Sequence, residues 1–384
     1  MGKKRLEFNR EPFYDPSRTY ADNMKYGPFG GFADRKKVIT SEDPSFDLFG
    51  YSVHLPFGIP AGPLLNGRFV KAALDKGFDI VVYKTVRSRI YPCHPWPNVL
   101  RVKIRGNLTV KMSKERPLVA DSHFNTKQFS ITNSFGVPSR DPDVWQKDLA
   151  NVLSWAKKKQ VVIGSFQGTA KGDGNIDSYI RDWVLTADLV RKTGVPILEA
   201  NLSCPNEGTS HLLCFDIDRT KKIVYAIKSK IGNTPLILKL ALFPDDKVLK
   251  KFVKEIGSMV EGLAAINTIP AQIVDGKYNQ ALPGTGRLRS GVCGHAIKWA
   301  GLEMVQRLKR LKTELSVNYT IIGGGGVFNI DDFHMYKRAG ADCVMSATGS
   351  MWNPYLAYDI KKSLKLSVTV SQGNYARRNH YRSS

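Results

Sequence analysis

Cysteine is scarce in this chain of 384 residues: there are five, and no two of them have CxxC spacing. A zinc or iron–sulfur site made by this chain alone is therefore not expected, and neither is a disulfide framework. No apolar run approaches the roughly 20 residues that a membrane helix requires. The N-terminal Met-Gly-Lys-Lys-Arg leads into polar sequence instead of the apolar core of a signal peptide. We therefore expect a cytoplasmic protein with no metal site and no membrane span.

Acidic residues are also few: 34 Asp and Glu stand against 57 Lys and Arg, which gives a net charge of +23. Such a surplus favours anionic partners, among them nucleic acid, acidic membrane surfaces and phosphorylated or carboxylated small molecules. However, basic runs such as 247–254 and 307–312 interleave with apolar residues at helical spacing. They also lack the clustered aromatic residues that stack on bases. We interpret most of the charge as exposed helix faces and expect no nucleic-acid partner.

Short apolar runs alternate with amphipathic segments along most of the chain. Strands are predicted at 57–61, 80–84, 161–166, 197–202, 236–240, 264–268, 320–323 and 343–347. Helices are predicted at 68–76, 176–192, 219–230, 247–260, 295–312 and 330–339. This alternation predicts an α/β fold, a (β/α)8 TIM barrel with its active site at the C-terminal ends of the strands. An open doubly wound sheet is the alternative, but no GxGxxG turn follows the first strand.

Additional segments accompany the expected barrel. The boundaries that we expect are an N-terminal arm at 1–45, the TIM barrel at 46–362 and a C-terminal tail at 363–384. A long insertion, at about 86–160, follows the second strand, and a loop of such length usually carries structure or function of its own. Alternating residues at 99–104 and 107–112 predict a hairpin around Arg105 and Gly106. A second, polar insertion at 270–290 is expected to lie over the barrel mouth.

Polar residues occur where the predicted strands end. The segment Asn-Leu-Ser-Cys-Pro-Asn at 201–206 places the thiol of Cys204 between the carboxamides of Asn201 and Asn206. Two carboxamides could bind the edge of a flat amide-bearing ring beside a thiol that carries a proton. Alternatively, Cys204 is a small buried hydrophobic residue and the asparagines form turns. Lys84 and Lys239 each end an apolar strand, where an ammonium requires an anionic partner, either a ligand or a structural salt bridge.

A glycine run at 323–326 precedes a helix that is expected to begin near Asn329. Free backbone N–H groups beside a helix N-terminus bind phosphate. In TIM barrels phosphate commonly lies at the loops after strands seven and eight, where this run and the pair Ala347-Thr348 fall. A flexible turn without a ligand is the alternative.

With these motifs, residues from about 48 to 358 resemble the dihydroorotate dehydrogenases, the flavin mononucleotide (FMN) enzymes of pyrimidine biosynthesis. The motifs that carry the resemblance lie at 82–85, 132–138, 201–206, 238–240, 266–268 and 291–298, together with the two phosphate loops. Cys204 stands where the membrane-associated class has serine. The resemblance is therefore to the soluble class 1 branch.

The resemblance implies the oxidation of dihydroorotate to orotate. Cys204 would take a proton from ring carbon 5 while a hydride leaves carbon 6 for FMN, and Lys239 would stabilise negative charge on the reduced flavin. The implied substrate-binding residues are Lys84, Asn133, Phe135, Gly136, Val137, Asn201, Asn206, Asn267 and Thr268. The implied FMN-binding residues are Ala61, Gly62, Lys84, Thr85, Asn201, Lys239, Asn267, Gly294, Gly324, Gly325, Gly326, Ala347 and Thr348. The implied partners are a small-molecule substrate such as dihydroorotate, a second copy of the chain in a homodimer, and an iron–sulfur electron-transfer subunit.

Some residues depart from the class 1 pattern, and other functions stay open. The segment 207–214 lacks the Pro-Gly-Lys-Pro stretch familiar in class 1, and Cys293 stands where glycine or serine is usual. A dehydrogenase of another pyrimidine-like ring is therefore one alternative. A second is a tRNA dihydrouridine synthase, also an FMN barrel with a cysteine after Asn-x-x-Cys-Pro, although Ser203 replaces the glycine of its motif. A third is a flavin-binding scaffold without turnover. The electron acceptor could be fumarate, a quinone, or NAD through a partner.

Overall fold

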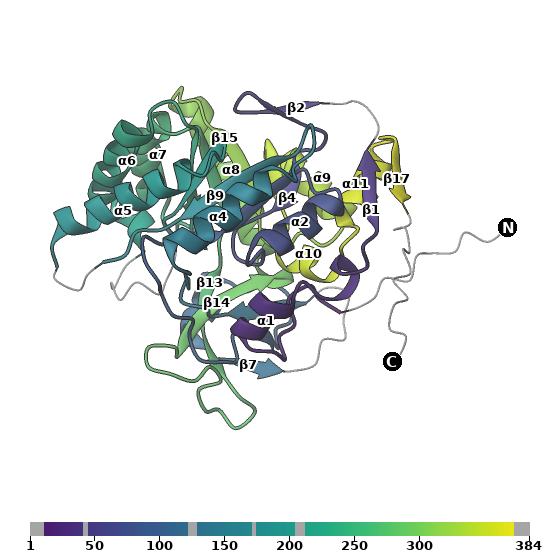
Figure 1. The fold of residues 1–384 in the computed structure, drawn as a ribbon. Helices are drawn as coiled ribbons and strands as arrows, with labels where there is room; N and C mark the ends of the chain where they lie inside the picture. Colours follow the sequence, from purple (N-terminus) through teal and green to yellow (C-terminus); the bar gives the residue numbers. More distant parts are fainter. Residues whose placement is uncertain (1–10, 41–44, 122–128, 171–173, 204–211, 372–384) are drawn as a thin grey trace.

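The computed structural model describes residues 11–40, 45–121, 129–170, 174–203 and 212–371. Within these ranges, which Figure 1 shows in colour, parallel strands close a barrel in the order β4–β5–β9–β10–β11–β12–β15–β16 according to their hydrogen-bonded pairing. Their bounds are β4 (Phe57–Ile59), β5 (Ile80–Val86), β9 (Val161–Phe166), β10 (Ile197–Asn201), β11 (Leu236–Leu240), β12 (Gly262–Ala265), β15 (Thr320–Gly324) and β16 (Cys343–Met345). The predicted (β/α)8 barrel is confirmed, and each predicted strand overlaps one of these strands.

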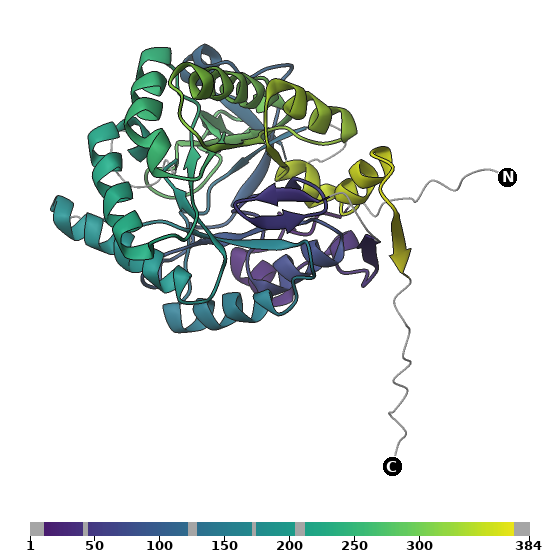
Figure 2. The ribbon, with the colours of Figure 1, turned by 90° about the horizontal axis from the view of Figure 1, so that it is seen from above.

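Helices surround the barrel (Figure 2). Their bounds are α2 (Gly67–Asp75), α4 (Pro142–Leu153), α5 (Ile176–Arg191), α6 (Ile217–Ile231), α7 (Asp246–Ile256), α8 (Lys298–Glu314), α9 (Ile330–Ala339), α10 (Thr348–Trp352) and α11 (Leu356–Ser363). Capping residues define several of the starts: the side chains of Asn175 and Asp216 accept hydrogen bonds from N–H groups in the first turns of α5 and α6. On α7 the buried residues recur at helical spacing, so its lysines face outward, as the sequence predicts for the basic runs.

The inside of the barrel is apolar at one end and polar at the other. Side chains alternate across a strand, so Ile197, Glu199 and Asn201 of β10 all face inward. Ile197 belongs to an apolar cluster of inward residues from several strands. Leu48 and Val53 extend this cluster from the hairpin of β2 (Phe46–Leu48) and β3 (Tyr51–Val53), which covers the N-terminal end of the barrel (Figure 2). The polar residues lie toward the C-terminal ends of the strands.

A second, smaller sheet lies beside the barrel (Figure 1). Its strands are β13 (Ile269–Val274), β14 (Arg289–Gly294), β8 (Ser130–Asn133), β6 (Val99–Val102) and β7 (Leu118–Asp121), in that order. The sheet closes on itself, because β7 also pairs with β13. The strands come from both expected insertions. The second insertion is therefore not only a polar cover, because its ends pair as β13 and β14.

The predicted hairpin at 99–112 is wrong. The first half is β6, but residues 110–115 form helix α3 (Val110–Glu115), because the Thr109 side chain accepts the backbone N–H of Met112 as an N-cap. The strands that pair with β6 are instead β7 and β8. Helix α4 within the first insertion is also missing from the prediction. Asp148 of α4 accepts hydrogen bonds from the backbone N–H of Gly67 (2.8 Å) and the Tyr83 hydroxyl (2.7 Å), so α4 is attached to α2 and β5.

The described part of the N-terminal segment packs against the barrel, because Phe13, Tyr14 and Phe32 belong to the main apolar core. It contains α1 (Tyr20–Tyr26), the 3-10 turn η1 (Gly30–Phe32) and β1 (Lys37–Thr40). Strand β1 pairs antiparallel with β17 (Val368–Ser371), which lies within the expected C-terminal tail. A buried ion pair between Lys361 of α11 and Asp79 (2.7 Å) lies near this pairing. No helix within the described ranges is both long enough and apolar enough to cross a membrane.

Candidate functional site

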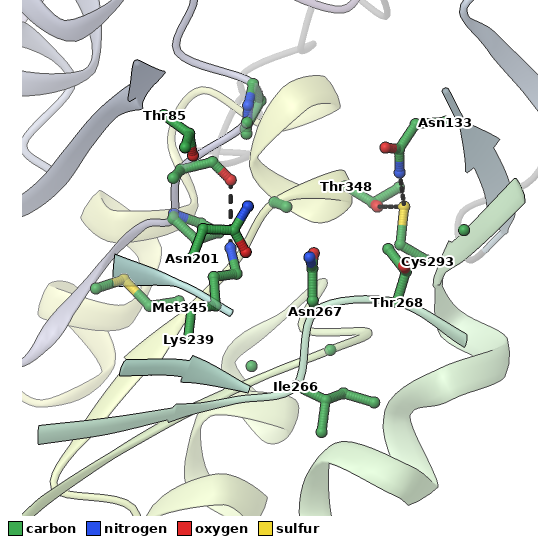
Figure 3. A pocket seen from close by; sticks show the side chains of 18 of the residues that line it. Thr85, Asn133, Asn201, Lys239, Ile266, Asn267, Thr268, Cys293, Met345 and Thr348 are labelled. Carbon is green, nitrogen blue, oxygen red and sulfur yellow. Dashed lines mark hydrogen bonds between the residues drawn. The ribbon is translucent and has the colours of Figure 1, made fainter. Parts of the chain in front are cut away.

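A cavity lies at the C-terminal ends of the barrel strands and reaches β8 and β14 of the small sheet (Figure 3). Every predicted site residue that the structure describes lines it: Ala61, Gly62, Lys84, Thr85, Asn133, Phe135, Gly136, Val137, Asn201, Lys239, Asn267, Thr268, Gly294, Gly324, Gly325, Gly326, Ala347 and Thr348. Cys204 and Asn206 lie outside the described residues. The C-terminal ends of the parallel strands thus bring together residues that are far apart in the chain.

Lys239 and Asn201 lie side by side at one wall of this cavity (Figure 3). The parallel pairing of β10 with β11 places these two residues opposite each other. The Lys239 ammonium is buried and donates to the Ala61 carbonyl at 3.3 Å. The Asn201 amide donates to Gln167 Oε1 at 3.0 Å. A cation held in this way is positioned to attract a negative charge that enters the cavity.

Glu199 lines the same cavity and is absent from the sequence prediction. It is 3% exposed, and burial raises its pKa, while the Lys239 charge and the Ser165 hydroxyl act in the opposite direction. Ser165 Oγ lies 2.9 Å from Thr85 Oγ1, so a row of polar groups crosses neighbouring strands from β5 to β11. A signal was present in the sequence, because Glu199 shares the inward alternation of Ile197 and Asn201.

Lys84 and Arg87 hold the loop that follows β8. The Lys84 ammonium donates to the Pro138 carbonyl at 3.0 Å, and the Arg87 guanidinium donates to the Val137 carbonyl at 3.0 Å. Gly136 has φ +77°, and a Cβ there would come within 2.5 Å of the His94 ring, so no larger residue fits without movement. Phe135, Gly136 and Val137 are therefore presented to the cavity in a defined conformation.

The residues just before Cys204 belong to a hydrogen-bonded group. The Ser203 hydroxyl donates to Asn201 Oδ1 at 3.1 Å, and the Asn267 amide donates to Ser203 Oγ at 3.1 Å. Asn201 and Asn267 both line the cavity from the ends of different strands. The chain therefore leaves the barrel toward Cys204 from a fixed position.

Glycine backbones line another part of the cavity. Gly294, Gly325 and Gly326 have φ values of +97°, +122° and +69°. A Cβ at Gly326 would lie 2.8 Å from the Gly294 carbonyl oxygen, so the two loops approach too closely for a side chain. The Tyr336 hydroxyl donates to the Gly325 carbonyl at 2.7 Å and fixes the loop from outside. Backbone packed in this way, next to the start of α9, suits a phosphate group.

Cys293 of β14 lies between Asn133 of β8 and Thr348 of α10 in the cavity lining (Figure 3). Its sulfur accepts hydrogen bonds from the Asn133 amide and the Thr348 hydroxyl, each at 3.4 Å. Burial raises the pKa of the Cys293 thiol, so the sulfur is protonated at neutral pH. Cysteine stands here where glycine or serine is usual, and two neighbouring side chains donate to its sulfur. Among the residues in the described ranges, no group of at least three His, Cys, Asp or Glu could hold a metal ion.

Comparison with known proteins relates the chain to one enzyme family. A sequence model described as "Dihydroorotate dehydrogenase" matches residues 113–367. The chain is 34% identical over 362 residues to the dihydroorotate dehydrogenase of Dictyostelium discoideum, covering 90% of this chain and 96% of that protein. It is 28% identical over 238 residues to the dihydroorotate dehydrogenase B (NAD(+)) catalytic subunit of Thermodesulfovibrio yellowstonii, covering 61% of this chain and 72% of that protein. The corresponding subunit of Oceanobacillus iheyensis is 31% identical over 237 residues, covering 61% and 71% of the two chains.

Proposed function

The chain belongs to the dihydroorotate dehydrogenase family, a family of oxidoreductases that act on a CH–CH bond, and we propose that it oxidises dihydroorotate to orotate with FMN as its flavin. The relatives are consistent with the class 1 branch that Cys204 predicts. The observation that supports this function most directly is the single cavity lined by two buried lysines, three asparagines and the glycine loops.

The glycine loops fit the phosphate of FMN. A Cβ at Gly294 would lie 2.5 Å from the Phe129 carbonyl oxygen and one at Gly326 would lie 2.8 Å from the Gly294 carbonyl oxygen, so both loops line the cavity with bare backbone. The residues that would hold FMN are Ala61, Gly62, Lys84, Thr85, Asn201, Lys239, Asn267, Gly294, Gly324, Gly325, Gly326, Ala347 and Thr348. When bound, FMN supplies an acceptor for the hydride. Lys239 would hold a positive charge near the bound flavin and would stabilise negative charge there.

The remaining polar residues suit a pyrimidine ring with a carboxylate. Carboxamides donate and accept at once, so Asn133, Asn201 and Asn267 match the alternating N–H and C=O groups of such a ring. The buried ammonium of Lys84 and the backbone of the loop at 135–137 would bind the carboxylate. Cys204 would accept the proton, and it follows directly on the hydrogen-bonded Ser203. Asn206 would complete the contacts to the ring.

The electron acceptor and the assembly belong to the same proposal. Some of the related proteins are named as NAD(+) catalytic subunits. By analogy, a homodimer and an iron–sulfur electron-transfer subunit are proposed partners, with NAD, fumarate or a quinone as the final acceptor. The size of the complex that copurifies with the chain distinguishes these arrangements.

An anaerobic titration tests the function. Heat release followed by chromatography should recover FMN from the purified yellow protein, and dihydroorotate should bleach the flavin without oxygen. Each candidate acceptor is then added to the reduced protein, and the one that restores the yellow colour is identified. Recovery of FAD, or a flavin that dihydroorotate leaves oxidised, would contradict the proposal.

A further inference from the structure

Tyr14, in the segment before α1, lines the same cavity as the barrel residues. Its neighbour Phe13 is held firmly, because its backbone N–H donates to the Met351 carbonyl (2.9 Å) and its carbonyl accepts from Phe29 (3.0 Å). The Phe13 ring packs edge-on against Phe32 with centroids 4.6 Å apart. Tyr14 is therefore part of the ordered cavity wall.

The hydroxyl of Tyr14 is buried and has no hydrogen-bond partner among the residues in the described ranges. Other buried tyrosines are satisfied: Tyr319 donates to the Leu308 carbonyl at 2.8 Å, and Tyr336 donates to the Gly325 carbonyl. A buried hydroxyl without a partner destabilises the protein, so such a group usually has a ligand or another role. Burial raises the pKa of Tyr14, which keeps its hydroxyl protonated and able to donate.

The surroundings of Tyr14 place it near the carboxylate-binding part of the cavity. Its ring packs edge-on against Phe135, with centroids 5.5 Å apart and the planes at 89°. Phe135 also contacts Tyr20, whose ring lies 5.4 Å from the Lys84 ammonium. Tyr14 and Lys84 thus belong to one local cluster around Phe135.

We propose that the Tyr14 hydroxyl donates a hydrogen bond to the carboxylate of the substrate, so that the N-terminal segment is part of the substrate site. This inference rests on the proposed function, because it takes the carboxylated ring from there. Lys84 supplies the positive charge and Tyr14 a neutral donor from a different part of the chain. The ligand would then satisfy a hydroxyl that the protein leaves without a partner.

The Tyr14→Phe variant tests this role in the FMN-loaded enzyme. Removing a donor to a charged group should weaken orotate binding by about tenfold or more, measured by calorimetry. The kinetic loss should fall on KM for dihydroorotate more than on kcat. Uracil, which has the same ring without the carboxylate, should lose little affinity. Without a ligand, the thermal midpoint should stay the same or rise, because no protein hydrogen bond is removed.

Tyr319→Phe is the matched control, since Tyr319 is equally buried but donates to a protein carbonyl remote from the cavity lining. This variant should lower the thermal midpoint and keep the parent's affinity for orotate. Unchanged orotate affinity in Tyr14→Phe would overturn the inference, as would an equal loss for orotate and uracil or a lowered thermal midpoint without ligand. In each of these cases the parent still binds orotate. A parent that fails to bind orotate would overturn the proposed function, and this inference with it.

Discussion

Two buried lysines at opposite ends of the barrel have different surroundings. Lys361 lies near the N-terminal ends of the strands, where its ammonium donates to Asp79, the Gly77 carbonyl and the Thr40 hydroxyl at 2.8–3.0 Å. Lys239 lies at the C-terminal ends, where its hydrogen bond within the described residues is to the Ala61 carbonyl at 3.3 Å. An ammonium has three donors. The first lysine is saturated by the protein, whereas the second keeps donor capacity for a ligand.

This difference separates stability from function within one barrel. A saturated ion pair holds α11 against the start of β5, and removing one partner leaves the other buried without compensation. At the cavity, a less saturated cation costs some stability and provides an electrostatic site that need not reorganise during the reaction. Variants at the two ends should therefore affect different measurements.

The largest effect is expected from Cys204→Ala, if Cys204 is the proposed base. Loss of a general base should slow flavin reduction by dihydroorotate by about 10² to 10⁴, measured by stopped flow without oxygen. A free thiol has a pKa near 8.5, so the parent rate should rise as pH approaches about that value. Cys204→Ser should retain a fraction of the activity, shifted to higher pH.

Cys214→Ala is the control for this prediction. Burial raises the pKa of Cys214 to about 12, so this thiol does not act as a base at neutral pH. The variant should therefore reduce its flavin at the rate of the parent. If Cys204→Ala kept the rate and pH profile of the parent, Cys204 would be structural.

Lys239→Ala should come next in size. Because one positioned charge is lost from the cavity, flavin reduction should slow by about 10² to 10³, while the thermal midpoint changes little. The rate is measured at saturating dihydroorotate, and calorimetry of the same sample gives the midpoint. A Lys239→Ala variant with a lowered thermal midpoint and the parent's rate of flavin reduction would mean that Lys239 serves stability and not the reaction.

Lys361→Met should show the opposite behaviour. Asp79 would remain buried without its partner, which typically costs about 3–5 kcal/mol of the free energy of unfolding. Denaturant titration measures this loss, and the folded fraction should reduce its flavin at the parent rate. The double variant Asp79→Asn/Lys361→Met should recover part of the stability, because no charge is then buried alone. Loss of flavin reduction in folded Lys361→Met would show that this ion pair also affects the cavity, which would contradict the separation of stability from function.

The buried Asp79 carboxyl should make the stability of the protein depend on pH. Burial raises the pKa of Asp79 to about 6 against the attraction of Lys361, so the folded state binds a proton that the unfolded state has already lost. The contribution of Asp79 to stability is therefore present below its ordinary value of 3.8 and is lost as pH rises through about 6. Relative to the double variant, the parent should lose free energy of unfolding between these two pH values. If the parent gained stability between these pH values relative to the double variant, the raised pKa of Asp79 would be contradicted.

The smallest effect is expected from Glu199→Gln. The buried carboxylate of Glu199 acts against the Lys239 charge, so its removal makes the cavity more positive. Orotate is an anion, so it should bind the Glu199→Gln variant several-fold more tightly than the parent. Calorimetry measures the two affinities. The isosteric side chain keeps the volume, and Glu199→Asp serves as a charged control. Weaker orotate binding in Glu199→Gln would contradict this electrostatic role of Glu199.

The sequence predicts those elements whose pattern is local. Strand β9, strand β11 and helix α9 occur with the predicted bounds, since each combines a clear period with polar or capping residues at its ends. The small sheet was not predicted as a unit, because β8 and β14 pair across a long stretch of sequence without a local signal. The segment 107–112 alternates like a strand, but the Thr109 cap and the tertiary pairing of β7 with β6 determine its structure.

The same distinction between local sequence pattern and tertiary packing applies to the site residues. Lys84, Asn201 and Lys239 are found by asking which polar residues end apolar strands, because parallel strands bring their ends together. Glu199 was recoverable from the same alternation. Tyr14 was not, since it belongs to an irregular segment whose position depends on packing against distant residues. Cys204 and Asn206 lie outside the described residues, so their place in the cavity stays a prediction.

The pairing of β1 with β17 has a consequence for synthesis of the chain. Residues 37–40 are synthesised more than 300 residues before their partners at 368–371. The barrel itself closes through β4 and β16, which are almost as far apart in the sequence. The cavity therefore cannot be completed before β16 has been synthesised, and termination before β16 removes barrel closure and the β1 pairing at once.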